Sequence, residues 1–147
     1  MILLASDHAG FELKEKVKKY LDEIGKKYED LGNTAFEAND DYPDFVHPLA
    51  KRVSENPGLK GILFCGSGQG MAIVANRYPN VRAAVCWDIE SARETRKSND
   101  SNVLSIPARM VDEPTALKII KIWLETPFSN EERHTRRIKK IDSTSSL

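Results

Sequence analysis

The chain alternates between two hydrophobic patterns. Short runs of consecutive apolar residues predict buried strands, and the clearest of these runs extends from Gly61 to Cys65. Between the runs, apolar residues such as Leu13, Val17 and Leu21 recur at the spacing of a helix with one buried face. Strands are therefore expected at 2–6, 27–31, 61–65, 82–87 and 102–106, and helices at 13–24, 45–55, 71–77, 89–97 and 113–125.

The order of these elements indicates one α/β domain that spans residues 1–147. Strand and helix alternate about five times, which predicts a Rossmann-like three-layer α/β/α sandwich with a five-stranded parallel sheet. The polar segment from Asn39 to Asp44 contains Pro43 and is expected to be a loop. Ligands of such folds bind beyond the carboxyl ends of the strands, so the residues that follow each strand are the first candidates for a site.

The last segment, from about 130 to 147, has a different pattern. Glu131 to Asp142 is charged and has few apolar residues, although it is expected to be helical, and Ser143 to Leu147 is expected to fray. Such a helix packs poorly on its own chain. It is either a solvated tail or a helix that docks on a partner subunit.

Composition narrows the class of protein. Lys plus Arg and Asp plus Glu both number 22, so no net charge draws the chain to nucleic acid or to an anionic membrane. No apolar run approaches the ~18 residues of a membrane span, and the amino terminus lacks the basic segment of a signal peptide. The two cysteines are expected to be free thiols in a reducing cytoplasm, and no CxxC or HExxH motif suggests a metal site.

A glycine-rich loop follows the clearest strand. The sequence Cys65-Gly66-Ser67-Gly68-Gln69-Gly70 opens an expected helix, where backbone N–H groups and the helix dipole favour an anion. Met71 replaces the third glycine of the dinucleotide fingerprint, and the Gly-Lys-Ser/Thr of a P-loop is missing. The loop therefore favours a small anionic group or a developing oxyanion over a nucleotide cofactor. A tight strand-to-helix turn without function is the alternative.

Cys65 stands where the strand meets this loop. A free thiol has a pKa of about 8.5, and a helix N-terminus is expected to lower it and to produce a usable base or nucleophile. The alternative is a small buried hydrophobic residue. Cys86 also ends an expected strand, but no glycine-rich loop follows it, so we assign it to the core.

Other charged residues are candidates for binding a phosphate. Asp7 and His8 follow the first expected strand, although Asp7 could cap the next helix and His8 could be structural. Arg133 and Arg137 are four residues apart, so one helix face would carry two guanidinium groups that suit a phosphate dianion. The alternative is a solvated run of charges. Arg109, after the last expected strand, is either a third phosphate ligand or a surface residue.

Taken together, these features resemble the type B ribose-5-phosphate isomerase family, which also contains the galactose-6-phosphate isomerase subunits. The resemblance covers nearly the whole chain, and the order and spacing of its pieces are highly specific. Its carriers are Ser6-Asp7-His8-Ala9-Gly10-Phe11, Leu13-Lys14, Asp41-Tyr42-Pro43-Asp44, Gly61-Ile62-Leu63-Phe64-Cys65-Gly66-Ser67-Gly68, Ala75-Asn76-Arg77, Val81-Arg82-Ala83-Ala84, Asn99-Asp100, Asn102-Val103-Leu104 and Arg133-His134-Thr135-Arg136-Arg137-Ile138.

The resemblance implies an enzyme that interconverts aldose and ketose sugar phosphates through a cis-enediolate, with no metal and no cofactor. It also implies a homodimer or a dimer of dimers whose sites are built from two subunits, which would explain the unusual C-terminal helix. By resemblance, Cys65 is the base that moves a proton between C1 and C2, and Ser67 assists it. The enediolate oxygens would be held by the amides of Gly66, Gly68 and Gly70 and by the Asn99 side chain. The sugar would be held by Asp7 and Tyr42. The phosphate would be held by His8, Arg109, Arg133 and Arg137.

One position departs from the family pattern. Before the Asn-Asp pair the family usually has a histidine, which protonates the ring oxygen and opens the furanose, and this chain has Ser98. Serine is too weak an acid for this step near neutral pH. Ring opening could fall to His134 or to a water relayed through Ser98, or the enzyme could be slow or depend on the open-chain fraction of its substrate. Alternatively, the natural substrate is a different sugar phosphate.

The leading hypothesis is the interconversion of ribose 5-phosphate and ribulose 5-phosphate. Ser98 supports two alternatives. One is an isomerase of a six-carbon sugar phosphate such as galactose or allose 6-phosphate, and the other is a non-catalytic sugar-phosphate-binding protein. Cys65, the glycine-rich loop and the paired arginines argue against a binding protein, because binding alone does not need a base.

Overall fold

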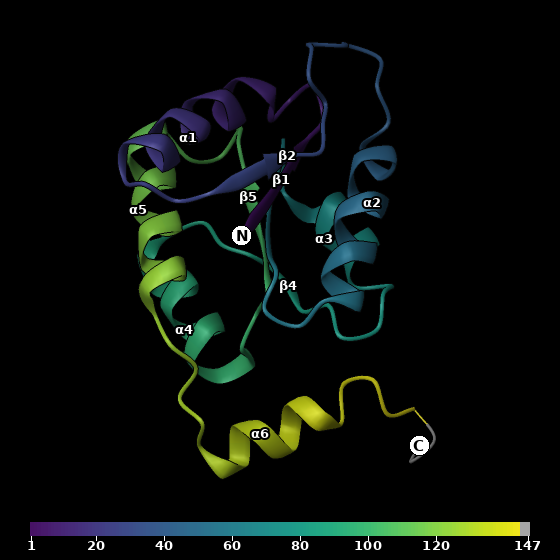
Figure 1. Cartoon of the computed structure of the whole chain (residues 1–147), viewed down its shortest axis with the longest axis vertical. Coiled ribbons are helices and arrows are strands. Elements are labelled where there is room, and N and C mark those ends of the chain that lie inside the picture. Colours follow the sequence, from purple (N-terminus) through teal and green to yellow (C-terminus); the bar gives the residue numbers. More distant parts are fainter. Residues whose placement is uncertain (145–147) are drawn as a thin grey trace.

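The computed structural model describes residues 1–144 and has the expected three layers (Figure 1). Within these residues, five strands form one parallel sheet in the order β2-β1-β3-β5-β4. They are β1 (Ile2–Ser6), β2 (Tyr28–Asp30), β3 (Lys60–Cys65), β4 (Ala83–Val85) and β5 (Val103–Pro107). All five predicted strands are confirmed. Most of the tail that was expected to fray, residues 145–147, lies outside the described residues.

Six helices occur in the same part of the chain: α1 (Phe11–Glu23), α2 (Tyr42–Glu55), α3 (Gln69–Ala75), α4 (Ile89–Asn99), α5 (Glu113–Glu125) and α6 (Glu132–Lys139). The first, fourth and fifth cover one face of the sheet, whereas α2 and α3 cover the other (Figure 1). The prediction of a loop as far as Asp44 is wrong at its end, because α2 already begins at Tyr42. Pro43 lies in the first turn of α2, where its missing N–H removes no helical hydrogen bond.

Alternate strand residues supply two separate hydrophobic cores. In β3, Ile62 and Phe64 pack under α1 and α5, whereas Leu63 and Cys65 pack under α2 and α3. This alternation follows from the pleat, which turns successive side chains to opposite faces of the sheet. Because both faces are covered, β3 is a continuous apolar run with no polar face, and this explains why it was the clearest strand in the sequence.

The connectivity of the sheet leaves a crevice between β1 and β3. The chain passes from β1 to β2 on one side, and β3 lies on the other side of β1. The connections therefore diverge at this point, which is the place where open α/β sheets bind ligands. Asp7 follows β1 and Cys65 ends β3, so the fold brings both residues to the same crevice.

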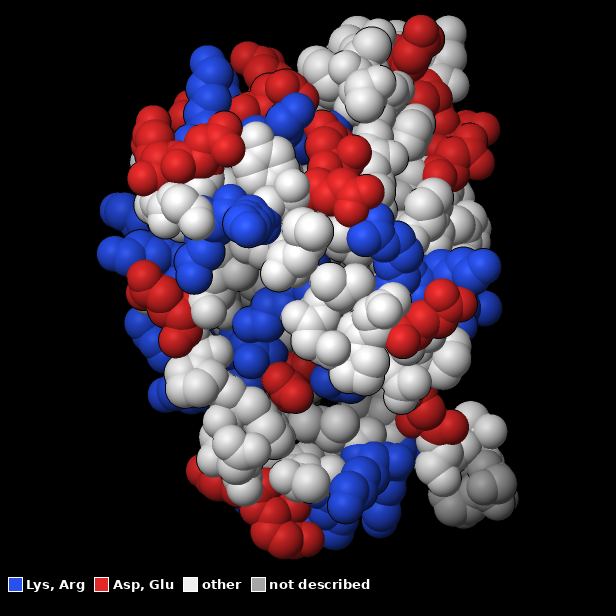
Figure 2. All heavy atoms as spheres, in the orientation of Figure 1, with Lys and Arg blue, Asp and Glu red and all other residues white. Residues whose placement is uncertain are grey.

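The last helix, α6, stands apart from the three layers. An extended segment joins it to α5, and its contacts with other elements are mainly with α4 (Figure 1). His134 is its only buried residue. Acidic side chains gather near its start and basic side chains near its end (Figure 2). The expectation of a charged helix that packs poorly on its own chain is confirmed.

In residues 1–144, none of the helices has both the length and the apolar composition needed to cross a bilayer.

Candidate active site

A cavity of about 360 Å³ opens at the carboxyl ends of β1 and β3, and we call it the strand-end cavity. Ala9 and Met110 are part of its lining. The other lining residues were all proposed from the sequence: Asp7, His8, Tyr42, Cys65, Gly66, Ser67, Gly70 and Arg109. These residues are far apart along the chain, and the parallel sheet brings them together.

The thiol of Cys65 is held by the loop that opens α3. Cys65 is 5% exposed, and its Sγ accepts a hydrogen bond from the Gly68 N–H at 3.1 Å. Gly68 has a φ of 74°, a conformation that favours glycine, and its carbonyl accepts a hydrogen bond from the Ser105 hydroxyl at 2.6 Å. The structure therefore directs the Gly68 amide at the sulfur, where it stabilises the thiolate.

Burial raises the pKa of the Cys65 thiol above its usual value, and the negative charge of Asp7 adds to the rise. The backbone N–H groups of Met71, Gly68 and Ser67 oppose this shift without cancelling it. The expectation that the helix N-terminus lowers this pKa is therefore wrong. The reason is that the sulfur lies deeper than sequence position suggested, so its lost hydration outweighs the amides.

Cys86 differs from Cys65, as the sequence indicated. It is fully buried and belongs to the hydrophobic core, away from the strand-end cavity. Burial raises the pKa of its thiol to about 12. Its assignment to the core is confirmed.

Two glycines let large side chains lie directly against the loop. A Cβ at Gly70 would lie 2.7 Å from the ring of Tyr42, and a Cβ at Gly66 would lie 3.2 Å from the Arg109 side chain. Arg109 reaches this position because its N–H donates to the Gly66 carbonyl at 3.0 Å. The side chains of Tyr42 and Arg109, which are far apart in the sequence, therefore both line the cavity.

Asp7 lines the cavity and contacts the segment before α1, although the N-cap of that helix is Gly10. Its carboxylate accepts a hydrogen bond from the Gly10 N–H at 3.1 Å, just before α1 begins. Burial raises the pKa of Asp7. The residue thus combines a structural contact with a position beside the thiol.

Asp40 orients His8, and sequence reasoning missed it. Its carboxylate contacts His8 Nδ1 at 2.7 Å and accepts the His8 backbone N–H at 3.2 Å, with only 6% of the Asp40 side chain exposed. Burial favours the neutral acid, but the hydrogen bonds from His8 lower the pKa of Asp40. No sequence signal separates Asp40 from its neighbours Asp41 and Asp44.

Asp7, His8 and Asp40 also have the spacing of metal ligands, with ligand atoms within 4.8 Å of one another. However, Nδ1 of His8 and an oxygen of Asp40 already contact each other, and the Asp7 carboxylate accepts the Gly10 amide. We therefore interpret the group as a hydrogen-bond network that fixes His8.

A second cavity, of about 460 Å³, lies between α4 and α6, and we call it the helix cavity. Ser98 and Asn99 reach it from the last turn of α4. Arg133 and Arg137 reach it from α6, as expected of residues four apart on one helix face. The buried His134 also lines it, and its Nδ1 contacts the Ser129 hydroxyl at 2.7 Å.

The structure thus separates the predicted site residues into two groups. The strand-end cavity has the thiol, the glycine-rich loop, His8 and Arg109, whereas the helix cavity has Ser98, Asn99 and the two arginines of α6. No residue lines both cavities. Gly68 does not line the strand-end cavity, but its N–H donates to the Cys65 sulfur.

The fold and the strand-end cavity define an α/β protein with a buried thiol and a glycine-rich loop at the switch point of a parallel sheet. Residues 2–141 match the family model described as Ribose/Galactose Isomerase. The chain belongs to this isomerase family, which confirms the resemblance inferred from the sequence.

Relatives and solved structures match almost the full length of the chain. Ribose-5-phosphate isomerase B of Mycolicibacterium paratuberculosis is 39% identical over 93% of this chain and 86% of the relative. The ribose 5-phosphate isomerase structure from Thermotoga maritima is 46% identical, with a TM-score of 0.91 over 96% of each chain. The Mycoplasma genitalium ribose-5-phosphate isomerase B, solved with bound ribulose-5-phosphate, is 37% identical, with a TM-score of 0.94 over 99% of this chain and 95% of that one.

Proposed function

We propose that the chain interconverts ribose 5-phosphate and ribulose 5-phosphate through a cis-enediolate, with Cys65 as the base. The observation that carries this proposal is the strand-end cavity, in which a buried thiol with an amide hydrogen bond lies beside Asp7, His8 and Arg109. These groups offer a base, a polar contact for the sugar and cationic contacts for the phosphate. Relatives named ribose-5-phosphate isomerase B support the same choice of substrate.

In the proposed reaction, the Cys65 thiolate removes the proton on C2 of the open-chain aldose phosphate. The electrons of that C–H bond form the C1–C2 double bond, and the carbonyl oxygen on C1 takes the negative charge. The thiol then returns the proton to C1, while the proton of the C2 hydroxyl passes to the C1 oxygen. The loop amides at Gly66 and Gly70 and the Ser67 hydroxyl line the cavity as donors to these oxygens, each worth roughly 10²–10³ in rate.

The helix cavity completes the site from a second subunit in this proposal. Its arginines and Asn99 line a different cavity from Cys65 on the same chain, and α6 buries little of its own surface. In a two-fold dimer the same two patches meet twice, so the helix cavity of each subunit can close the strand-end cavity of the other. A homodimer, alone or as a dimer of dimers, would therefore account for arginines that line a different cavity from Cys65.

Ring opening is assigned to the helix cavity as well. Ser98 and His134 both line it, so His134 can pass a proton to the ring oxygen through Ser98 or through a water that Ser98 holds. The contact with Ser129 occupies Nδ1 of His134 and leaves Nε2 for this exchange. Mutation of Ser98 to histidine would restore a direct acid at this position.

A six-carbon sugar phosphate, such as galactose or allose 6-phosphate, is the second candidate substrate. The observation that favours it is Ser98, since serine is smaller than histidine and leaves more room in the helix cavity. The binding-protein alternative has less support, because the buried, hydrogen-bonded thiol has no purpose in binding alone.

A substrate comparison tests the proposal. We expect ribose 5-phosphate to give the highest kcat/KM among pentose and hexose phosphates, and Ser98→His to increase its rate. A higher kcat/KM for a six-carbon substrate would replace the first candidate by the second. No turnover of any of them would favour the binding protein.

Mixed dimers test whether the site is shared. Cys65→Ala and Arg137→Ala chains are each expected to be nearly inactive at low substrate concentration. If the two residues act across the interface, a heterodimer of these chains contains one intact site, and an equal mixture should recover about a quarter of the wild-type rate. A mixture no more active than its parts, with subunit exchange verified, would show that the site lies within one chain.

A further inference from the structure

A third cavity, of about 380 Å³, opens at the opposite ends of the strands from the strand-end cavity, and we call it the basic cavity. Lys60, the first residue of β3, lines it, whereas Cys65 is the last residue of the same strand. Arg82 reaches it from the segment before β4, and Arg96 and Asp100 reach it from the end of α4. Its lining therefore contains three basic side chains and one acidic side chain.

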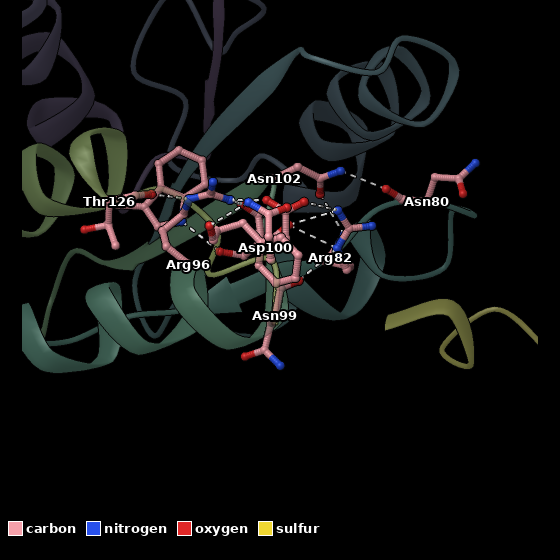
Figure 3. Close-up of polar contacts among 11 residues, drawn as sticks. Asn80, Arg82, Arg96, Asn99, Asp100, Asn102 and Thr126 are labelled. Carbon is pink, nitrogen blue, oxygen red and sulfur yellow. Dashed lines mark hydrogen bonds and ion pairs between the residues drawn. The ribbon is translucent and has the colours of Figure 1, made fainter. Parts of the chain in front are cut away.

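The two arginines are held in place by backbone carbonyls (Figure 3). Arg96 donates from Nε to the Thr126 carbonyl at 3.1 Å and from Nη1 to Asp100 Oδ1 at 2.8 Å. Arg82 donates from Nε to the Asn99 carbonyl at 3.0 Å and from Nη2 to the Asp100 carbonyl at 2.9 Å. Both guanidinium groups are thus fixed before any ligand arrives, which lowers the entropic cost of binding.

Each arginine keeps one terminal nitrogen for a ligand. Within residues 1–144, Nη2 of Arg96 and Nη1 of Arg82 donate no hydrogen bond to the protein. The single carboxylate of the lining, Asp100, is already shared by the two guanidinium groups, at 2.8 Å from Arg96 and 3.5 Å from Arg82. The pair therefore retains a net positive charge and unused donors.

Lys60 adds a third cation that has no ion pair within residues 1–144, although the charge of Asp100 partly offsets the shift in its pKa. Its ammonium makes neither a hydrogen bond nor an ion pair with any residue that the structure describes, and its contact is with the Trp123 ring, 5.3 Å from the ring centre. Burial lowers the pKa of Lys60, and the charge of Arg96 lowers it further. An anion in the cavity would supply the missing partner and relieve this repulsion.

We propose that the basic cavity is a second anion-binding site, which takes a phosphate group either as the free ion or on a small phosphorylated molecule. Three cations with unused donors match the several oxygen acceptors of a phosphate, and two of the cations are arginines that suit its geometry. The volume is within the range of small-molecule sites. The proposal does not depend on the isomerase activity, because it concerns the opposite ends of the strands.

Equilibrium dialysis with inorganic phosphate at constant ionic strength tests this site. The full chain carries Arg137→Ala in all samples, which weakens the phosphate position proposed for the isomerase reaction. We expect this protein to bind phosphate and Lys60→Gln to weaken the affinity by about tenfold or more. Lys60→Arg, which keeps the charge, should retain most of the binding.

Lys51→Gln is the matched control, because Lys51 is exposed on α2, outside the basic cavity, and its substitution should leave the affinity unchanged. Circular dichroism verifies that each variant is folded. Absence of phosphate binding in the Arg137→Ala chain, or equal affinity with and without Lys60→Gln, would overturn the proposal. If Lys60→Gln does not fold, the same comparison is made between Lys60→Arg and Arg82→Gln.

A parallel titration with glycerol 3-phosphate distinguishes the two sources of the phosphate group. Tighter Lys60-dependent binding of the monoester than of inorganic phosphate would assign the site to a phosphorylated molecule. Tighter binding of inorganic phosphate would assign it to the free ion. Either result supports the site, whereas binding of both ligands that is insensitive to Lys60 would contradict it.

Discussion

The strand-end cavity and the helix cavity are built in opposite ways. The first rests on β1 and β3, whose residues are almost all buried, and its thiol is 5% exposed. The second rests on the last turn of α4 and on α6, where the Arg133 side chain is 58% exposed. In the proposed dimer, each chain thus presents a half-site that its own core holds rigid and a half-site that lies on its surface.

The difference shows which functions each cavity can perform alone. A side chain at the end of a core strand is fixed by packing before a ligand arrives, as proton transfer requires. On α6 the ion pairs are instead exposed: Arg133 with Glu131 at the helix cavity and Arg136 with Glu132 outside it, each worth about 0–1 kcal/mol. In the proposed mechanism, proton transfer between C1 and C2 therefore belongs to the strand-end cavity, whereas ring opening and the α6 contacts to the phosphate belong to the helix cavity.

The largest effect is expected from removal of the base in the rigid cavity. Cys65→Ala should lower kcat by about 10²–10⁴, because the proton on carbon then has no acceptor within the site. Cys86→Ala is the matched control, since that thiol is buried away from the cavity. Steady-state turnover of ribose 5-phosphate measures both. A Cys65→Ala enzyme with wild-type kcat would remove the thiol from the mechanism.

The surface half-site should respond through KM instead of kcat. Arg137→Ala is expected to raise KM about 10–100-fold, because it removes charged hydrogen bonds to the phosphate, and to leave the melting temperature nearly unchanged. Arg136→Ala serves as control on the same helix, because Arg136 does not line the helix cavity. Equal KM values for the two variants would return α6 to the solvated-tail interpretation.

The pH dependence of the rigid half-site follows from the raised pKa of Cys65. Because the thiolate is the reactive form and most of the thiol is protonated near neutral pH, kcat/KM should increase by close to tenfold per pH unit below that pKa. Cys86→Ala should keep this slope. A flat profile between about pH 6 and about pH 8 would contradict a thiol base.

The stability of the fold should decrease as the pH rises, whereas kcat/KM should increase. A thiol whose pKa is higher in the folded state stabilises the fold fully below its unfolded pKa, and this contribution is lost as the pH rises through the folded pKa. Cys65 and Cys86 both have raised pKa values, so alkaline conditions should favour activity and weaken the fold together.

The smallest effect is expected from Arg82, which lines neither the strand-end cavity nor the helix cavity and contacts the end of α4. It donates to the carbonyls of Asn99 and Asp100, and Asp100 has a φ of 45°, which is strained for a residue with a side chain. Arg82→Ala should lower kcat by about 3–10-fold, since Asn99 loses its positioning contact. Arg82→Lys should recover part of the loss.

The control for Arg82 is the exposed Arg77, which lines neither the helix cavity nor the basic cavity. A fall in melting temperature with unchanged kcat would mean that Arg82 is only structural. A fall in kcat at a temperature where the variant is fully folded would support the positioning role.

The central strands β1, β3 and β5 were predictable because each is a short, mostly apolar run buried on both faces. The ends of helices were less predictable where the same residues are compatible with both a loop and a helical turn. The start of α2 at Tyr42 was missed because Pro43 and two aspartates are typical of a loop, yet the same residues are compatible with a first helical turn. Packing of Val46 and Leu49 against the sheet decides between the two, and that contact is not visible in the local pattern.

The site was predictable where a residue follows a strand. Asp7 and the loop from Cys65 to Gly70 could be assigned together because parallel strands end at one edge. Asp40 could not be assigned, since it reaches His8 through a polar segment with no periodicity. The raised pKa of Cys65 was also missed, because the depth of a sulfur depends on what covers it.

By itself, the sequence determined the class of fold, the thiol and glycine-rich loop at a strand end, and the pair of arginines on one helix face. These features follow from periodicity and from neighbours within a few residues. Only the tertiary structure decided that the thiol and the arginines occupy separate cavities, that Asp40 holds His8, and that three cations meet around the basic cavity. Such relations join residues from different helices, strands and loops, and they depend on how helices pack on the sheet, which local pattern does not encode.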